Sequence, residues 1–199
     1  MIKRSHINPT LRIFRGYEWI LVSKIRIFQI RFCLLRSNDL IELKISMIQI
    51  YEKVLYAGWA DMDFNGHMAN RAFLDKSGDV RMMFFSENGL SGRNMAKMRI
   101  GPVIKSDKLE YFLEIGLMEE IKCTLILVGT SKDGSRFKIC NEFKKMNGSL
   151  AARVTSVGGW LDLKSRKLIA PPDLVLKMMD KLHKTEDFEQ LPSSIRKTP

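Results

Sequence analysis

Two carboxylates and an imidazole stand close together in one short polar segment. Asp61 and Asp63 are separated by one residue, and the turn signal Asn65-Gly66 precedes His67. A carboxylate can act as a nucleophile or as a general base toward water, and an imidazole can orient either. The same residues can instead serve as turn or cap carboxylates and as a structural histidine, because Asp accepts local N–H bonds readily.

A helix is predicted directly after this segment. Between Asn70 and Asn88 the apolar residues recur at helical spacing, and the stripe consists of Ala72, Phe73, Val80, Met83 and Phe84. The first amides of a helix lack intrahelical acceptors and carry the positive end of its dipole. Those near Met68 to Asn70 could therefore polarise a carbonyl group, and Gly66 would let the backbone approach a ligand closely.

Strands are predicted on both sides of the helix. Apolar residues on even positions between Ile48 and Trp59 predict a strand with a buried even face, formed by Ile48, Ile50, Val54, Tyr56 and Gly58. After a loop at residues 91–98, residues 99–114 are expected to form one long or broken strand. The turns Asp133-Gly134 and Asn147-Gly148 join three further strands into an antiparallel meander. One long helix must bury its stripe against this sheet, which predicts an α+β fold.

Length and charge indicate one domain with extensions. The chain has 199 residues and a net charge of +11, and residues 1–46 hold a disproportionate share of that charge. We expect residues 1–46 to be a basic extension outside the catalytic domain. Their composition resembles that of an organelle transit peptide, but they could also be translated sequence upstream of a true start at Met47. Residues 47–183 are expected to form the domain, which ends with a short helix after Pro171-Pro172, and residues 184–199 a disordered tail.

Composition excludes several classes of function. Cys33, Cys123 and Cys140 fit neither a disulfide framework nor a metal spacing, which predicts apolar packing roles, no metal site and a reducing, cytoplasmic location. The apolar stretch from Trp19 to Leu35 is interrupted by basic residues, so no stable membrane insertion is expected. The aromatic and basic motifs of nucleic-acid binders are absent, so no nucleic-acid partner is expected.

The polar segment resembles a known family signature. The sequence DMDFNGHMAN at 61–70, followed by Phe73-Leu74, Arg81 and Phe84-Phe85, is similar to that of the 4-hydroxybenzoyl-CoA thioesterase-like family of hotdog-fold acyl-CoA thioesterases. That family has Asp-x-Asp, two residues, Gly-His, a short spacer and Asn at the start of the central helix. The resemblance spans residues 50–175 and implies a hotdog fold, in which an antiparallel sheet wraps around one long helix. Ala69 and Phe73 stand where many relatives have asparagine and tyrosine.

The resemblance also implies an activity and a set of site residues. The chain is expected to hydrolyse acyl-CoA with water and without a cofactor, as a homodimer or homotetramer whose sites lie at a subunit interface. Asp63 is implied to be the nucleophile or the general base, with Asp61 as a supporting acid and His67 as a catalytic aid. The implied substrate-binding residues are Gly66, Met68, Ala69, Asn70 and Phe73, although Asn70 is also a common helix cap.

A second reading stays open beside the enzyme. The chain could be a hotdog protein that binds an acyl ligand without turning it over. Asp63 with the Gly66-His67 turn favours the enzyme, whereas Ala69 keeps the binding protein open. Basic residues on the later strands are candidates for the CoA phosphates and are equally explained as solvated strand faces: Lys138, Lys144, Lys145 and Arg153.

Overall fold

The computed structural model of the chain describes residues 50–195, and the predictions for residues 1–46, Ile48 and Cys33 lie outside them. In this part of the chain the strands form a single sheet in the order β1-β3-β4-β5-β2, with β6 beside β5 and β7 beside β3. The strands are β1 (Tyr51–Tyr56), β2 (Ile100–Tyr111), β3 (Glu120–Ser131), β4 (Arg136–Lys145), β5 (Leu150–Asp162), β6 (Leu168–Ile169) and β7 (Lys184–Leu191). The helices are η1 (Trp59–Asp61), α3 (Asn70–Glu87), α4 (Gly92–Met98) and α5 (Asp173–Met179).

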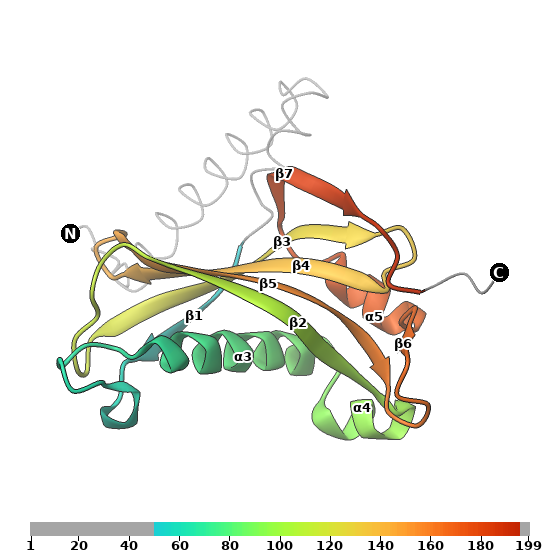
Figure 1. The fold of residues 1–199 in the computed structure, drawn as a ribbon, viewed down its shortest axis with the longest axis horizontal. Helices are drawn as coiled ribbons and strands as arrows, with labels where there is room; N and C mark the ends of the chain where they lie inside the picture. Colours follow the sequence, from blue (N-terminus) through green and yellow to red (C-terminus); the bar gives the residue numbers. More distant parts are fainter. Residues whose placement is uncertain (1–49, 196–199) are drawn as a thin grey trace, which may run out of the picture. The chain divides into compact units, whose positions relative to one another are not determined.

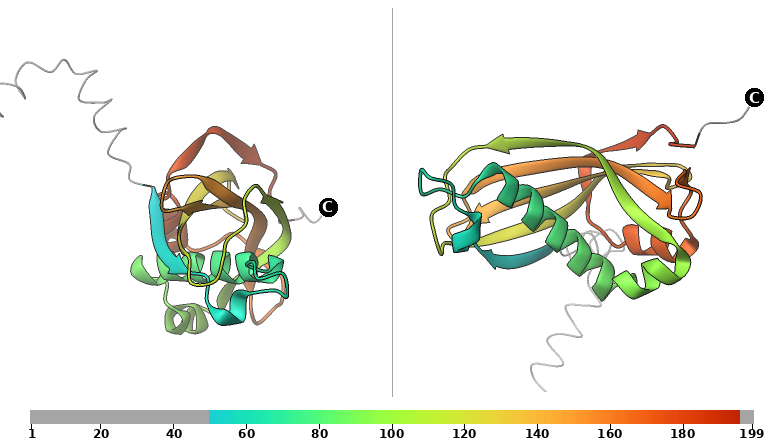
Figure 2. Two further views of the ribbon diagram at one scale, coloured as in Figure 1. Left: turned by 90° about the vertical axis from the view of Figure 1, so that its left-hand side faces the viewer. Right: turned by 60° about the horizontal axis from the view of Figure 1, so that its bottom comes forward.

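Helix α3 lies along one face of the sheet, and the sheet curves around it (Figures 1 and 2). The side chains that α3 buries are Ala72, Phe73, Ser77, Val80, Phe84 and Phe85. The predicted helix and its apolar stripe are therefore confirmed, apart from Met83, which stays 38% exposed. Phe85 is buried in its place, with its ring centroid 5.7 Å from that of Trp160 on β5. The α+β prediction of a sheet wrapped around one long helix is also confirmed.

The predicted antiparallel meander is confirmed as β3, β4 and β5. Their pairing runs through the two predicted hairpin turns, where Gly134 and Gly148 have φ of 67° and 89°. Strand β2 pairs antiparallel with the outer side of β5 along nearly its whole length and has no second neighbour among the described strands. The meander thus fixes the middle of the sheet, and β2 forms an edge beside α3.

The predicted buried face of the first strand is wrong. Tyr51 and Leu55 on the odd positions of β1 pack against the core, while Val54 and Tyr56 are 50% and 52% exposed. The apolar even residues point to the face of the sheet that α3 does not cover. Alternation identified the strand but not which of its two faces meets the helix, because both faces carry large apolar residues.

Two segments predicted to lack regular structure are ordered. The predicted loop at residues 91–98 contains α4, where Ser91 Oγ accepts the N–H of Asn94 and Met95 is buried. The predicted disordered tail contains β7. It pairs parallel with β3 from Leu127 to Ser131, next to the part of β3 that pairs with β1, which reaches Leu125. Its charged side chains suit a solvent-facing edge strand, and Lys138 Nζ lies 2.6 Å from Glu189 Oε1. Long-range pairing therefore orders a segment that has no core pattern of its own.

Candidate active site

The loop between β1 and α3 closes into a short hairpin. Met62 bridges Met68, and His67 bridges Gly116 from the segment after β2. At the tip, the N–H of Asp63 donates to His67 O at 2.9 Å, and the N–H of Gly66 donates to Asp63 O at 3.2 Å. Gly66 has φ of +80°, a backbone conformation that residues with a side chain rarely adopt. These bonds give the polar segment a defined shape directly before the helix.

Asp63 occupies the exposed tip of this hairpin. Its Oδ1 accepts the backbone N–H of Asn65 at 2.8 Å and that of His67 at 3.3 Å. Its Oδ2 has no hydrogen-bond partner among residues 50–195. The predicted turn role is therefore present, but it uses one oxygen only. The second oxygen is free to contact water or a substrate.

Asp61 is placed quite differently, with its side chain only 18% exposed. Its Oδ2 accepts the N–H of Gly58 at 2.7 Å and lies 2.8 Å from Lys76 Nζ on α3. Burial favours the neutral acid, but the hydrogen bonds from Lys76 and Gly58 outweigh burial and lower the pKa of Asp61. Asp61 is thus an ionised anchor that ties the loop to the helix.

His67 contacts Asp63 through its backbone, while its imidazole turns toward another carboxylate. Its Nε2 lies 3.0 Å from Glu114 Oε2, and the side chains of the pair are 45% and 70% exposed. Neither Asp61 nor Asp63 bonds to the imidazole within the region described. The structure therefore does not bring the three predicted catalytic side chains into one hydrogen-bonded group.

The amides at the start of α3 are mostly engaged already. The N–H of Met68 donates to Ile115 O, and the N–H of Ala69 donates to Asp61 O, each at 2.8 Å. The N–H of Arg71 is taken by Asn70 Oδ1 at 2.7 Å. The amide of Asn70 is left without an acceptor in the part of the chain that the structure covers. Of the predicted donors near residues 68–70, it alone can face a ligand without breaking a bond.

Three predicted substrate-binding residues have other local roles. Ala69 holds the N-cap position of α3 without a side-chain bond, and Asn70, the first residue of the helix, caps the N–H of Arg71 through its Oδ1. Met68 is 5% exposed and Phe73 is 2% exposed, both within the core. The Phe73 ring packs edge-on against Tyr111 and Phe143, with centroids 5.6 Å and 5.2 Å away. Met68 and Phe73 therefore support the loop from the hydrophobic core.

Sequence reasoning missed two partners of the loop, Lys76 and Glu114. Lys76 lies three residues after Phe73 and four before Val80, so it falls on the apolar stripe of α3. A lysine at such a position needs a counter-ion, and Asp61 supplies it. Glu114 follows β2 and gave no local signal, because only the bridge between His67 and Gly116 brings it to the imidazole.

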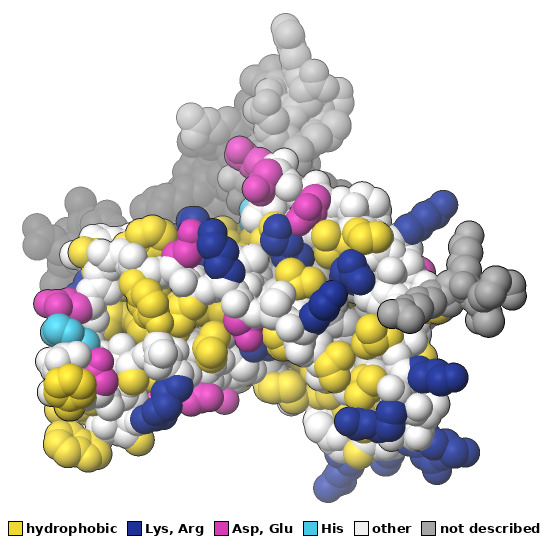
Figure 3. Space-filling model, in the orientation of Figure 1, with side chains coloured by type: hydrophobic (Ala, Val, Ile, Leu, Met, Phe, Trp, Pro, Cys, Tyr) yellow, Lys and Arg dark blue, Asp and Glu magenta, His cyan; other side chains and the backbone are white. Residues whose placement is uncertain are grey.

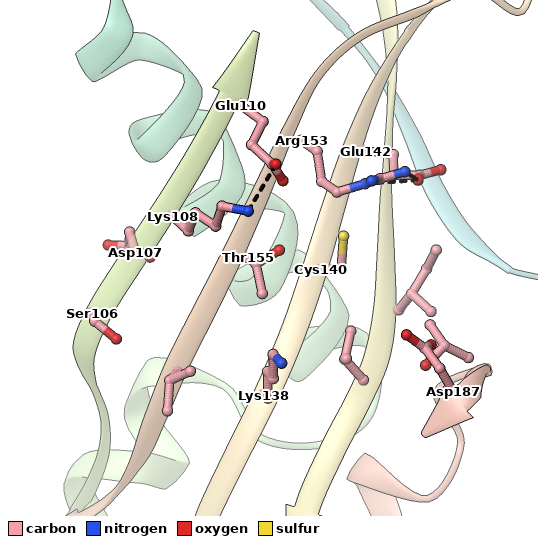
Figure 4. Close-up of a pocket in the computed structure, with 14 residues that line it drawn as sticks. Ser106, Asp107, Lys108, Glu110, Lys138, Cys140, Glu142, Arg153, Thr155 and Asp187 are labelled. Carbon is pink, nitrogen blue, oxygen red and sulfur yellow. Dashed lines mark hydrogen bonds and ion pairs between the residues drawn. The ribbon is translucent and has the colours of Figure 1, made fainter. Parts of the chain in front are cut away.

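A hollow of about 530 Å³ lies on the face of the sheet that α3 does not cover, between β2, β3, β4, β5 and β7 (Figure 4). Part of its charge is paired within the hollow: Lys108 lies 2.8 Å from Glu110, and Arg153 lies 2.8 Å from Glu142. Cys140 also lines the hollow, and burial raises the pKa of its thiol, which disfavours the reactive thiolate. The two ion pairs and the buried thiol therefore do not mark the hollow as a reactive site.

The basic candidates for the CoA phosphates all have acidic partners in the structure. Lys138 pairs with Glu189, Lys145 pairs with Glu119, and Glu142 takes both Lys144 and Arg153. These pairs explain the four cations as strand-face ion pairs. Cys123 and Cys140 are buried thiols, which confirms their predicted packing role, and burial raises the pKa of Cys123 to about 12.

The described residues contain neither a metal-binding cluster nor a membrane-spanning helix. No group of three His, Cys, Asp or Glu side chains in this region is arranged to hold a metal ion. None of the helices at residues 50–195 has the length and apolar character needed to cross a membrane.

The hairpin, the central helix and the wrapped sheet match a described family. The model of the thioesterase-like superfamily matches residues 57–179, which include the whole candidate site. The chain belongs to the thioesterase-like superfamily. The match starts directly after β1 and ends with α5, so β1 and β7 lie outside the matched range.

Solved structures confirm the hotdog fold of this superfamily member. A Staphylococcus aureus protein solved in complex with CoA is 19% identical, with a TM-score of 0.62 over 75% of this chain and 96% of that chain. A 1,4-dihydroxy-2-naphthoyl-CoA thioesterase from Synechocystis is 17% identical, with a TM-score of 0.60 over 66% and 96%. A gentisyl-coenzyme A thioesterase is 15% identical, with a TM-score of 0.58 over 65% and 99%. No curated protein sequence matches the chain.

Proposed function

We propose that this chain hydrolyses acyl-CoA thioesters to a carboxylic acid and free CoA, with Asp63 as the reacting carboxylate. The observation that carries the proposal is the free Oδ2 of Asp63, on a turn fixed by two amides at the entrance of α3. Membership of the thioesterase-like superfamily supports the reaction class. The fold that the chain shares with two named acyl-CoA thioesterases supports CoA as the carrier.

The geometry is compatible with two routes. In the first, Asp63 takes a proton from water as the water oxygen attacks the thioester carbonyl carbon, and the proton passes to the CoA sulfur as the C–S bond breaks. In the second, Asp63 itself attacks the carbonyl, CoA thiolate leaves, and water hydrolyses the resulting mixed anhydride. Both routes place negative charge on the carbonyl oxygen. The unengaged amide of Asn70 at the positive end of α3 is the donor proposed to stabilise it.

The other loop residues take supporting parts in this proposal. Asp61 holds the loop on α3 through Lys76, and His67 orients the hairpin through Glu114. Gly66 adopts the positive φ that the turn needs, and its lack of a side chain lets the thioester approach the backbone closely. Met68 and Phe73 then act on the substrate only through the shape of the loop, because their side chains are buried.

A homo-oligomer is part of the proposal. Strand β2 lacks a second neighbour in the described region, and Tyr111 and Phe112 at its end are 55% and 51% exposed. An edge with exposed aromatic residues is suited to pairing with its own copy about a two-fold axis, as a homodimer or within a homotetramer. A folded, active monomer in sedimentation at micromolar concentration would contradict this part. The cytoplasmic location stays a prediction.

The test is Asp63→Asn, assayed with a panel of acyl-CoA substrates by release of free thiol. Turnover is expected to fall by at least ~10²-fold, the lower range for a positioned base. The amide oxygen of Asn can still accept the N–H groups of Asn65 and His67, so the melting temperature and the affinity for a thioether analogue of acyl-CoA should change little. Asp79→Asn, an exposed acid-to-amide change on α3, is the matched control and should leave turnover unchanged.

A single turnover in ¹⁸O-water separates the two routes. Label in the Asp63 carboxylate of a recovered peptide would establish the nucleophile route with water attacking the aspartyl carbonyl of the anhydride, because the general-base route labels only the carboxylic acid product. Wild-type turnover in Asp63→Asn would remove the carboxylate from the mechanism.

A non-catalytic acyl-binding protein is the second candidate. The observation that favours it is the ordinary turn role of Asp63 Oδ1, together with an imidazole that bonds to neither Asp61 nor Asp63. It predicts that the wild type binds the thioether analogue but releases no thiol from any acyl-CoA. The same assay therefore decides between the candidates.

A further inference from the structure

A cation without a partner lies in the middle of α3. Arg81 Nε donates to Ser77 O at 3.1 Å, so the guanidinium group folds back over the preceding turn of the helix. Its Nη1 is buried and has no hydrogen-bond partner in the region described, and the same holds for Ser77 Oγ. At Gly78 a Cβ atom would meet nothing nearer than Arg81 Nη2 at 3.8 Å. A Cβ atom there would be in ordinary van der Waals contact with the guanidinium group.

No carboxylate neutralises this cation at contact distance. Among residues 50–195, Arg81 takes part in no ion pair, although ten other lysine and arginine residues do. Asp107 on β2 contributes favourably from farther away, and its Oδ1 is already bonded to Ser156 Oγ at 2.5 Å. Burial lowers the pKa of Arg81, with Asp107 acting in the opposite direction. A guanidinium group nevertheless stays charged in proteins.

The unpaired cation lines an otherwise apolar cavity between α3 and β2, of about 210 Å³. Besides Gly78 and Arg81, its walls are Met82, Phe85, Pro102, Ile104 and Phe137. Met82 and Ile104 are 40% and 38% exposed, so the cavity opens between the helix and the edge strand. Hydrophobic side chains are prominent over β2 and α3 on this face (Figure 3). A ligand that enters here meets apolar walls and one positive group.

A buried charge without a partner is costly, and the cost is removed when an oppositely charged group completes the pair. The guanidinium fork matches a carboxylate, which can accept two of its N–H groups. We propose that Arg81 binds a carboxylate at the far end of the acyl group, so that the preferred substrates are CoA thioesters of dicarboxylic acids. This inference rests on the proposed hydrolase function and specifies its substrate class.

The helix sets the length of such an acyl group. The guanidinium group lies near the level of Ser77, seven residues from the Asn70 amide, which corresponds to about 11 Å at ~1.5 Å of rise per residue. An extended carbon chain advances roughly 1.1–1.2 Å per bond, as follows from about 3.3–3.6 Å per three-bond residue. The span therefore fits about nine bonds, or a ten-carbon dicarboxylic acid.

The test compares two thioesters of equal length, the mono-CoA thioester of decanedioic acid and decanoyl-CoA. The wild type should show a kcat/KM at least ~10-fold higher for the carboxylated substrate, the lower range for a charged hydrogen bond. Arg81→Met should lower that ratio by roughly 10- to 100-fold, mostly through the carboxylated substrate. Arg81→Lys, which keeps the charge and loses the fork, should give an intermediate ratio. Arg93→Met, at an exposed arginine on α4, is the control and should keep the wild-type ratio.

Stability distinguishes a ligand group from a structural one. Without ligand, Arg81→Met should melt at or above the wild-type temperature, because it replaces a partly buried charge without an ion-pair partner by an apolar side chain of similar length. A clear loss of melting temperature, or of the oligomer in sedimentation, would mean that Arg81 serves the fold or the subunit contact and would overturn the proposal. Equal ratios for wild type and Arg81→Met would overturn it as well.

Failure of the hydrolase proposal gives a different result. If the wild type releases thiol neither from these two thioesters nor from any acyl-CoA of the panel, the hydrolase function fails, and the two thioesters then serve as ligands in calorimetric titration. Tighter binding of the carboxylated thioester that is lost in Arg81→Met would uphold the role of Arg81. Equal binding of both thioesters would refute it.

Discussion

Polar side chains have partners in the loop that leads into α3, whereas some buried polar groups in the middle of α3 have none in the described region. In the loop, Asp61 is neutralised by Lys76 and one oxygen of Asp63 is held by two amides. In the middle of the helix, Arg81 Nη1 and Ser77 Oγ are buried without partners in the described region. The loop leads into the same helix, and both regions pack against the same sheet.

The difference indicates what each region is built for. Satisfied polar groups lower the energy of one geometry, so the loop holds Asp63 in place before any substrate arrives. Unsatisfied buried groups raise the energy of the empty protein and gain most from a ligand that completes them. The loop is therefore interpreted as the site of the reaction and the middle of the helix as the site of acyl selection.

Breaking the satisfied region should have the largest effect on stability. Asp61→Asn removes the charge that pairs with Lys76, whose side chain is only 15% exposed. We expect a loss of about 2 kcal/mol, below the ~3–5 kcal/mol of a fully buried pair because this pair is partly solvated. That corresponds to a fall in melting temperature of about 4–8 °C in thermal denaturation. Turnover should fall less than in Asp63→Asn.

A double variant shows whether the pair itself causes this loss. Adding Lys76→Met to Asp61→Asn removes the cation that the first change leaves without a partner, so part of the lost stability should return. If the two changes are simply additive, Asp61 acts through Gly58 and the turn instead.

Acid should erase the difference between Asp61→Asn and the wild type. The folded-state pKa of Asp61 is lowered, so its stabilising effect is complete above the unfolded pKa of about 3.9 and disappears as pH falls through the folded value. The gap in melting temperature between the two proteins should be constant from pH 7 to pH 5 and close below about pH 4. A gap that widens in acid would mean that the shift has the opposite sign.

The smallest effect is expected from the deletion of residues 1–46. Residues 1–46 carry a basic, irregular pattern that matches nothing in the motif-bearing part of the chain. Their deletion should leave the melting temperature and the thiol-release rate nearly unchanged. A fall of more than about 8 °C, or ~2–4 kcal/mol in a chain of this size, would show that they pack on the domain and would complicate the comparison of loop and helix.

Local patterns in the sequence determined much of this protein. The 3.6-residue period located α3 to within one residue, and the Asp-Gly and Asn-Gly turns located the meander, because both depend on residues adjacent in the chain. The polar segment with Asp63 and Gly66 was also visible, since the turn chemistry is local. Its place before the helix predicted the loop in which the structure finds it.

The tertiary structure decided everything that depends on contacts between distant segments. The face of β1 that meets the core, the order of β7 and the pairing of His67 with Glu114 depend on neighbours that lie far away along the chain. The two similar-looking acids, Asp61 and Asp63, differ because Lys76 and the N–H of Gly58 reach only Asp61. Arg81 likewise resembles any helical arginine until β2 and the sheet enclose it without a counter-ion, because burial and pairing are properties of the folded chain.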